Sequence, residues 1–314
     1  MVTGNKGEWS EFYVFLKIIS ERCLRAADEN LEFLEGTYYP VIKIIRENHD
    51  ARKVIYDLSL VSDPASIDIA SDSEMRHVVV SDLPEKVKKI FSAISKSGRG
   101  TFSIPIADDL MRNLDCDRIS SSNGRKSDIS LVIHDYITGT EPEVGFSIKS
   151  RIGSPSTLLN ASRATNFIFR FSDGGTVARD DGAISTGRPM LRDSSRTARY
   201  TFDDASSIIF EKVQSDVFER NMRKIDTILP EIVAELLKAY YISCAGTKLS
   251  ELVEFVSLHV PIIRGFPLTK EDYEFKVKNL LWAIALGMVP NTEWDGNATV
   301  QGGYIIVKED GELA

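Results

Sequence analysis

The stretch SDISLVIHDYITGTEPEVGFSIKS, residues 127–150, consists of two short apolar segments that flank a polar turn. Apolar residues that alternate with polar ones predict the two strands of a β-hairpin. Asp128 begins the first strand, however, and Lys149 lies near the end of the second. Because Asp and Lys are rarely buried unless they are paired or bound to something, we expect the two side chains to meet at one edge of a sheet and bind a ligand there.

The register of this hairpin decides whether the two charged groups meet. Alternation places Ser147 and Lys149 on the same face of the second strand. With residues 138–139 at the centre of the turn, Asp128 lies directly across from Lys149, and Ser130 lies across from Ser147. Side chains in opposite positions are about 5 Å apart at Cβ, so the carboxylate and the ammonium group are expected to be close. A cross-strand ion pair with no further role is the alternative explanation.

The overall composition indicates the broad class of the protein. The chain has 314 residues, 43% of them hydrophobic, which is enough for one large domain or two smaller ones. Its formal net charge of −8 argues against a protein that coats nucleic acid non-specifically. Residues 149–199 reverse this charge locally, with nine basic residues, almost all Arg, against four acidic ones. Arg suits bidentate recognition of phosphate or guanine, although a solvated loop explains the same composition.

No segment of the sequence is typical of a membrane span or a signal peptide. The longest apolar run, LLWAIALGMVP at residues 280–290, is much shorter than the roughly 20 residues of a spanning helix. The three cysteines lie far apart, which favours free thiols in a reducing cytoplasm. The four histidines are scattered, so the sequence does not predict a zinc site.

The remaining patterns predict an α/β (α+β) fold with a mixed central sheet flanked by helices, followed by a mainly helical C-terminal half. Apolar spacings of three and four residues predict a helix over residues 8–31. The Gly-, Ser- and Arg-rich connection at 172–200 is long, and such loops are often functional or disordered. We expect a core with the Arg-rich loop over 1–204 and a helical region over 205–314, either separate or part of one domain. Further strands are predicted at 38–48, 53–60, 165–171 and the C-terminus, and further helices at 81–94 and from Ser154.

The order of these elements resembles the PD-(D/E)xK nuclease superfamily. An acid-bearing helix is followed by Asp128, by a strand that ends near Lys149, and by another helix. In that superfamily the Asp binds a divalent metal ion, and a second acid two residues before the Lys completes the site. Four blocks in the same order, spanning nearly the whole chain, are more specifically similar to the HpaII-type restriction endonuclease family. They are GNKGEWSEFYVFLKII, SDISLVIHDYITGTEPEVGFSIKS, GSPSTLLNASRATNFIF and GGYIIVKEDGELA. Family members continue past the last block, which is consistent with a truncated C-terminus here.

The sequence departs from the superfamily pattern at Ser147, where an acid is expected. One carboxylate is too few for a strong Mg²⁺ site, so a second acid has to come from another element. The first helix offers Glu8 and Glu11, which are three residues apart and therefore on one side of the helix. Glu11 stands among aromatic residues and is expected to point inward, with Glu8 as the other candidate. Two solvated acids favoured by the helix dipole are the alternative.

The resemblance implies a Mg²⁺-dependent type II restriction endonuclease, with Mn²⁺ as a substitute ion, that cleaves double-stranded DNA at a short palindromic GC-rich site, CCGG. Asp128 and Glu11 are implied as metal ligands, with the Ile148 carbonyl as a further contact. Lys149 is implied to orient or deprotonate the attacking water and to stabilise charge on the phosphate. Ser147 is expected to hydrogen-bond a ligand or a water beside the metal.

DNA contacts are expected in two places after the hairpin. The helix start at Ser154 offers backbone N–H groups to a phosphate, although an ordinary helix surface explains the same residues. The Arg-rich stretch is the candidate for base reading, because Arg to guanine is the commonest specific contact. Arginines also bind phosphates, so no single Arg is assigned to a base. The candidate DNA-binding residues are Arg151, Ser154, Asn160, Ser162, Arg163, Arg188, Arg192 and Arg196.

The resemblance also implies partners and a location. A palindromic site favours a homodimer with one active site per strand, and a cognate DNA methyltransferase would complete the restriction–modification system in the bacterial cytoplasm. Two other functions fit the same fold: a DNA repair or nicking nuclease, and a catalytically inactive DNA-binding protein, for which Ser147 is the best argument.

Overall fold

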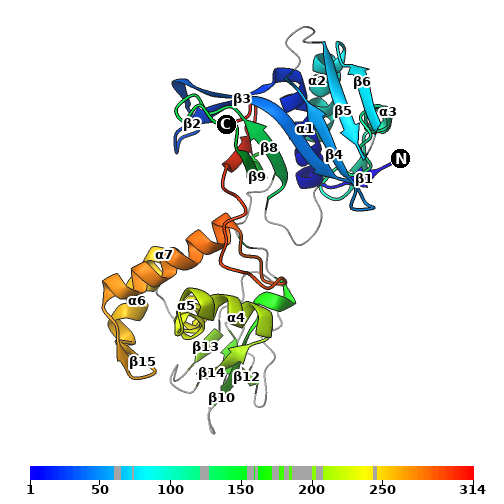
Figure 1. Ribbon diagram of the computed structural model, residues 1–314. Coiled ribbons are helices and arrows are strands. Elements are labelled where there is room, and N and C mark those ends of the chain that lie inside the picture. Colours follow the sequence, from blue (N-terminus) through cyan, green and yellow to red (C-terminus); the bar gives the residue numbers. More distant parts are fainter. Residues whose placement is uncertain are drawn as a thin grey trace. The chain divides into compact units, whose positions relative to one another are not determined.

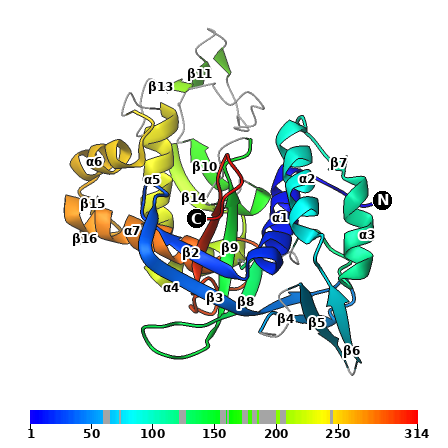
Figure 2. The ribbon, with the colours of Figure 1, turned by 90° about the horizontal axis from the view of Figure 1, so that it is seen from above.

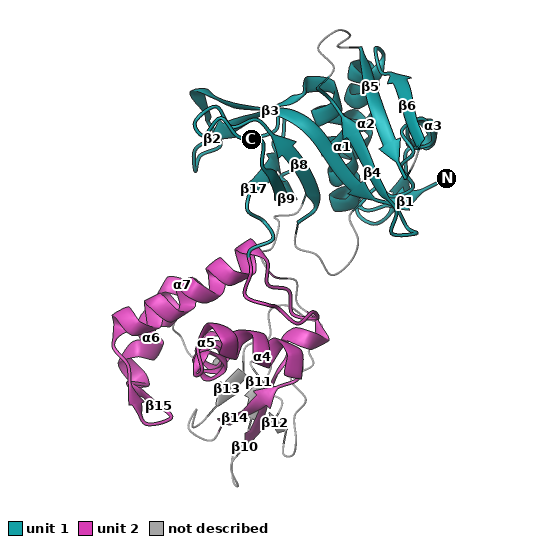
Figure 3. Ribbon diagram, in the orientation of Figure 1, with its two compact units in different colours: residues 1–158, 298–314 teal, residues 159–297 magenta. Residues whose placement is uncertain are grey.

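The computed structural model divides into two compact units, residues 1–158 with 298–314, and residues 159–297 (Figure 3). This division differs from the boundary near residue 204 expected from the sequence. The reason is that the last strand of the chain returns to the first unit and hydrogen-bonds there. The structure describes residues 1–59, 65–72, 74–120, 127–153, 159, 162–171, 177–179, 184–185, 200–202, 208–242 and 246–314.

Unit 1 is built on an eight-stranded sheet (Figure 1). The terminal strand β17 runs parallel to β9, whereas the other strand pairs are antiparallel, so the sheet is mixed as predicted. Its order is β17 (Gly303–Val307), β9 (Glu143–Ser150), β8 (Ile129–Ile133), β3 (Phe33–Glu47), β4 (Lys53–Asp57), β5 (Ser66–Ser71) and β6 (Glu74–Val79), with β2 (Cys23–Ala27) also paired to β3. The predicted mixed α/β fold is confirmed, and its assignment to the PD-(D/E)xK core stays a prediction.

Three helices, α1 (Lys6–Glu21), α2 (Leu83–Lys96) and α3 (Pro105–Asn113), lie on one side of this sheet (Figures 1 and 2). Two short strands, β1 (Thr3–Gly4) and β7 (Phe102–Ser103), pair beside them. The helix predicted over residues 8–31 ends ten residues early. Arg22 adopts a left-handed conformation with φ 54°, and the chain then pairs as β2 with β3. Tertiary pairing of the sheet therefore overrides the helical periodicity after Glu21.

Helix α1 is buried on nearly all sides because it lies between the sheet and α2. The ring of Phe15 packs against Tyr56 of β4, with centroids 4.8 Å apart. On the other side, the ring of Tyr13 is 5.3 Å from that of Phe91 on α2. Each fully buried aromatic side chain contributes about 1.5–3 kcal/mol of hydrophobic stabilisation, so α1 anchors the unit.

The hairpin of β8 and β9 has a register that differs by two residues from the predicted one. Ser130 pairs with Gly145 and Ile129 with Phe146, and the backbone N–H of Asp128, directly before β8, bonds the carbonyl of Phe146. The predicted pairing of Asp128 with Lys149, and of Ser130 with Ser147, is therefore wrong. Because side chains alternate with a period of two, a shift of two residues leaves each side chain on its predicted face.

The turn of the hairpin explains this difference. Asp135 and Thr140 form an isolated bridge, so the loop between them is longer than the tight turn that was expected. The Asp135 carboxylate accepts hydrogen bonds from the backbone N–H of Ile137 at 2.9 Å and from the Thr138 hydroxyl at 2.8 Å. Gly139 closes the loop with φ 66°, a conformation that favours glycine. An Asp that caps a turn locally is a signal that strand alternation does not reveal.

Unit 2 contains four helices, and the predicted helical region is thus confirmed for the described residues. They are α4 (Asp216–Ile225), α5 (Leu229–Ile242), α6 (Leu249–His259) and α7 (Lys270–Leu286). Helices α5, α6 and α7 share one apolar cluster. The strands of this unit are β10 (Phe167–Phe171) paired with β14 (Ile208–Val213), β15 (Ile262–Ile263) with β16 (Phe266–Pro267), and β11 (Val177–Arg179) with β12 (Ile184–Ser185) and β13 (Tyr200–Phe202). In the part of the chain that the structure describes, no helix has the length and apolarity to cross a bilayer.

Candidate active site

The start of β8 and the second half of β9 bring together the polar residues of the hairpin. Asp128 lies directly before β8, and its backbone N–H donates to the carbonyl of Phe146, the partner of Ile129, at 2.7 Å. The side chain of Asp128 reaches β9, where its Oδ2 atom lies 3.0 Å from the Ser147 hydroxyl and 3.9 Å from the Lys149 ammonium nitrogen. The sequence predicted this meeting of an acid and a lysine, and the structure confirms it.

Four residues form a continuous hydrogen-bond network, which we call the Asp128 network: Asp128, Ser147, Ile148 and Lys149. One carboxylate oxygen, Oδ2 of Asp128, accepts from the Ser147 hydroxyl at 3.0 Å and from the Ile148 N–H at 2.6 Å. The Lys149 ammonium group donates to the Ser147 hydroxyl at 2.9 Å and to the Ile148 carbonyl at 3.1 Å. The ammonium nitrogen is 3.9 Å from Oδ2, so the hydroxyl links the two charges more closely than they contact each other.

Burial makes these interactions stronger than they would be at an open surface. Ser147 is fully buried, whereas the side chains of Asp128 and Lys149 are 17% and 26% exposed. At such a position, opposite charges interact in a lower effective dielectric than water provides, yet solvent and ligands still reach them. The Ser147 hydroxyl donates to the anion and accepts from the cation, so it orients both charged groups.

Tyr304 is a residue of this region that the sequence interpretation missed. Strand β17 pairs in parallel with β9 so that Tyr304 is the partner of Ser147. The Lys149 ammonium group lies over the Tyr304 ring, 5.9 Å from its centroid. Burial raises the pKa of the Tyr304 hydroxyl, and the negative charge of Asp128 adds to this rise. The sequence GGY at the start of the last strand could have indicated Tyr304, but only the parallel pairing of β17 with β9 shows that this residue lies beside Ser147 and Lys149.

The two candidate acids of α1 have different surroundings. Glu8 forms a capping box with Asn5: its carboxylate accepts from the Asn5 N–H at 2.8 Å, and its own N–H donates to the Asn5 side chain at 3.1 Å. This structural role agrees with the alternative of helix-end acids. Glu11 is half-buried, and α1 contacts β9. Its role as the second acid stays a prediction.

The candidate DNA-binding residues fall into two groups. Arg151, directly after β9, is exposed, as are Ser162 and Arg163 of unit 2. The Ser162 hydroxyl accepts from the Ala164 N–H at 3.2 Å and so caps a short 3₁₀ helix at Arg163–Thr165. The other five, Ser154, Asn160, Arg188, Arg192 and Arg196, lie outside the described residues, as does most of the helix predicted from Ser154.

The oxygen donors of the network fit a hard, hydrated cation. Mg²⁺ prefers oxygen ligands and commonly keeps several waters while one or two carboxylates hold it. The Asp128 carboxylate and the Ile148 carbonyl, 3.9 Å and 3.1 Å from the Lys149 ammonium nitrogen, are donors of this kind. Among the residues that the structure describes, no three His, Cys, Asp or Glu side chains gather as metal ligands. Carboxylate and carbonyl oxygens, the donors of the Asp128 network, fit Mg²⁺ or Mn²⁺ better than zinc.

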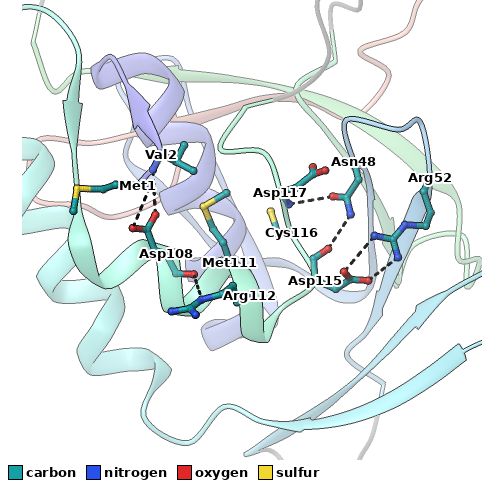
Figure 4. Close-up of a pocket in the computed structure, with 10 residues that line it drawn as sticks. All are labelled: Met1, Val2, Asn48, Arg52, Asp108, Met111, Arg112, Asp115, Cys116 and Asp117. Carbon is teal, nitrogen blue, oxygen red and sulfur yellow. Dashed lines mark hydrogen bonds and ion pairs between the residues drawn. The ribbon is translucent and has the colours of Figure 1, made fainter.

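A cavity of about 660 Å³ lies elsewhere in unit 1 (Figure 4). None of the residues of the Asp128 network lines it. Two of its carboxylates have partners within the lining: Arg52 donates to the Asp115 carboxylate at 3.1 Å, and Asp108 accepts from the Val2 N–H at 3.1 Å. The Asn48 side chain donates to the Asp115 carbonyl at 3.1 Å. These contacts join the N-terminus, the β3–β4 turn and the segment after α3, so a structural role explains them.

Comparisons with known proteins identify the family of the chain. The family model described as HpaII restriction endonuclease matches residues 5–314. The chain is 37% identical over 315 residues to the Type II restriction enzyme HpaII of Haemophilus parainfluenzae, which covers 99% of this chain and 84% of that protein. No solved structure matches the chain significantly. The match includes both strands of the hairpin as well as β17.

Proposed function

Because this chain belongs to the HpaII restriction endonuclease family, and so is a type II restriction endonuclease, we propose that the Asp128 network is its catalytic centre. The reaction is hydrolysis of a phosphodiester bond of double-stranded DNA. The observation that carries the proposal is the half-buried carboxylate and ammonium group that one fully buried hydroxyl holds together. A site with opposite charges that are oriented but incompletely paired is suited to bind an ion and stabilise developing charge.

The proposed metal is Mg²⁺, with Mn²⁺ as a substitute. The Asp128 carboxylate and the Ile148 carbonyl would hold it, and Glu11 is the proposed second acid. When bound, the ion supplies Lewis-acid polarisation of a phosphoryl oxygen and lowers the pKa of a bound water. The short bond from the Ile148 N–H to the Asp128 carboxylate, 2.6 Å, fixes the orientation of that ligand.

Lys149 is proposed to act on the attacking water and on the phosphate. Its ammonium group has three N–H donors, and two acceptors on β9 hold it in place. A positioned cation of this kind orients a water molecule and stabilises the negative charge that grows on the phosphate oxygens. Ser147 takes the position of the acid that the superfamily pattern expects, and here it orients Lys149 and Asp128.

We further propose that the substrate is a short palindromic GC-rich site, CCGG, which the family resemblance implies. A palindromic site has the same sequence on both strands, so a homodimer would place one Asp128 network at the scissile phosphate of each strand. Exposed arginines such as Arg151 and Arg163 are the proposed phosphate contacts among the described residues. A DNA methyltransferase of the same specificity is the proposed system partner.

Digestion of a plasmid of known sequence tests this proposal. With Mg²⁺ or Mn²⁺ we expect discrete fragments whose mapped ends all lie within CCGG, and no cleavage in excess chelator. The matched control is the same preparation carrying Lys149→Met, which should leave the plasmid intact. Discrete ends at another sequence would refute CCGG as the recognition site, but would still be consistent with the Asp128 network as the catalytic centre. Random degradation, nicking alone, or DNA binding without any cleavage would support the rival functions instead.

A further inference from the structure

Tyr304 belongs to the same face of the sheet as the Asp128 network, although it lies 155 residues beyond Lys149 in the sequence. The parallel register pairs Tyr304 with Ser147. On the β8 side, the Ser147 hydroxyl donates to the Asp128 carboxylate at 3.0 Å. Paired residues of neighbouring strands project to the same face, so the side chains of Tyr304 and Ser147 share one face of the sheet, and Asp128 contacts Ser147.

The glycines beside Tyr304 and on β9 permit this placement. A Cβ on Gly302 would lie 2.5 Å from the ring of Phe146, and a Cβ on Gly145 would lie 2.3 Å from the Thr299 carbonyl. Gly302 also donates its N–H to the Gly145 carbonyl at 2.9 Å. Any side chain at either glycine would push the two strands apart. The position of the strand start, and with it the register of Tyr304, therefore depends on glycine at both places.

The ring of Tyr304 supplies a contact that Lys149 lacks from its other neighbours. A lysine side chain has four flexible methylene groups, so its ammonium group needs several contacts to stay in one place. The Ser147 hydroxyl and the Ile148 carbonyl bind it on the β9 side. The aromatic face, 5.9 Å from the ammonium nitrogen, lies on the β17 side and is within the range of a cation–π interaction.

We propose that Tyr304 is a positioning residue of the active site, whose ring face holds the Lys149 ammonium group beside Asp128. The inference rests on the proposed role of Lys149. It assigns a function in catalysis to the terminal strand β17, which pairs with β9 and brings the Tyr304 ring to Lys149. Tyr304 acts through Lys149 by the face of its ring.

Two substitutions separate the ring from the hydroxyl. Tyr304→Phe keeps the aromatic face, and Tyr304→Leu removes it. We expect Tyr304→Leu to lower kcat about tenfold with KM for a duplex substrate within about twofold, and Tyr304→Phe to restore kcat to within about threefold of wild type. A Leu variant with wild-type kcat would overturn the proposal. So would a Phe variant as impaired as the Leu variant, because the hydroxyl would then be the active group.

A second measurement does not depend on cleavage. Competitive acetylation of lysines, read by mass spectrometry on the metal-free and DNA-free protein, reports the accessibility of the Lys149 amine. We expect Lys149 to react about threefold faster or more in Tyr304→Leu, but at the wild-type rate in Tyr304→Phe. Lys308 is the internal control, because its ammonium group lies over the ring of Phe33 at 5.1 Å and does not depend on Tyr304. Equal Lys149 labelling in all three proteins would overturn the proposal.

The two measurements distinguish the failure of this inference from that of the proposed function. If the wild-type protein cleaves no DNA, the proposed function fails, and the labelling still decides whether Tyr304 covers Lys149. If Lys308 labelling rises in Tyr304→Leu, the strand has loosened, and the unbranched Tyr304→Met variant replaces it. In Tyr304→Met we expect the same faster acetylation of Lys149 as in Tyr304→Leu. A wild-type acetylation rate of Lys149 in Tyr304→Met would refute the contact between Lys149 and the Tyr304 ring.

Discussion

The Asp128 network of unit 1 and a charged cluster around Arg223 in unit 2 are buried to a similar degree. The side chains of Asp128 and Lys149 are 17% and 26% exposed, and those of Glu231 and Arg223 are 15% and 28% exposed. The geometry of the two clusters differs, however. Arg223 bonds two carboxylates directly, whereas Lys149 reaches its carboxylate mainly through a hydroxyl.

The distances in the unit 2 cluster are those of satisfied ion pairs. Arg223 Nη2 donates to Glu219 at 2.7 Å and to Glu231 at 3.0 Å. Arg264 is 2.9 Å from the same Glu231 oxygen. Two cations and two anions thus compensate one another, and the cluster ties α4 to α5 and to the β15–β16 turn. Direct, complete pairing of this kind stabilises the fold and leaves little capacity to bind a ligand.

The comparison indicates that the completeness of pairing, and not burial, distinguishes the structural cluster from the proposed catalytic one. In the Asp128 network the opposite charges stay 3.9 Å apart, and the serine between them orients both. Such an arrangement gives up some stability that a direct ion pair would provide. Four predictions test this difference, in order of decreasing effect on cleavage.

The largest effect is expected from Asp128→Asn and Lys149→Met. Each should lower the cleavage rate by about 10²–10⁴-fold, because each removes a charge that the reaction needs. Neither should lower the melting temperature by more than a few degrees, because the charges are incompletely paired in the folded protein. Rates from plasmid cleavage and melting curves from circular dichroism measure the two effects. Normal cleavage by either variant would place the active site elsewhere and end the comparison.

The next largest effect is expected at the acids of α1, where Glu11 is the proposed second carboxylate of the metal site. Glu11→Gln should raise the Mg²⁺ concentration for half-maximal cleavage about tenfold or more, because it removes the proposed second carboxylate. Glu8→Gln is the matched control three residues away: the amide oxygen still accepts from the Asn5 N–H, so the titration should stay within about threefold of wild type. An unchanged titration for Glu11→Gln would leave Glu11 as an ordinary helix acid.

A smaller effect is expected from Ser147→Ala. The substitution removes the hydroxyl that links the two charges, and a hydrogen bond to a charged group contributes about 1.5–3 kcal/mol. Cleavage should therefore slow about ten- to hundredfold. Ser71→Ala is the matched control, because Ser71 is also buried and accepts from a cation, Arg52 Nη1, at 2.7 Å. It should reduce stability without slowing cleavage, and an equal loss of cleavage in both variants would contradict the role of Ser147.

The smallest effect on cleavage is expected from Arg223→Met, which should have the larger effect on stability. The substitution removes the ion pair of Arg223 with Glu219, whereas Glu231 keeps its ion pair with Arg264. Because these groups are partly exposed, the free energy of unfolding should fall by about 1–2 kcal/mol. Urea denaturation measures this loss, and the cleavage rate at low temperature should stay within about twofold of wild type. A loss of cleavage comparable with that of Lys149→Met would show that the unit 2 cluster is also functional.

Much of unit 1 was predictable because its signals are local. Alternation in residues 127–150 identified the hairpin and the face that carries Asp128 and Lys149, and periodicity identified α1 and α2. Errors arose where a distant segment decides the outcome. The end of α1 depends on pairing of β2 with β3, and the division of the chain depends on the return of β17 to β9.

The sequence by itself determined the residue types of the site and the face on which they lie, because side-chain alternation is a property of any strand. It also determined the family, through blocks that span the chain. Only the tertiary structure decided that Ser130 pairs with Gly145 and not with Ser147, because an Asp-capped turn sets the register. It alone placed Tyr304 beside Lys149, since a parallel strand pair joins residues that no local pattern connects.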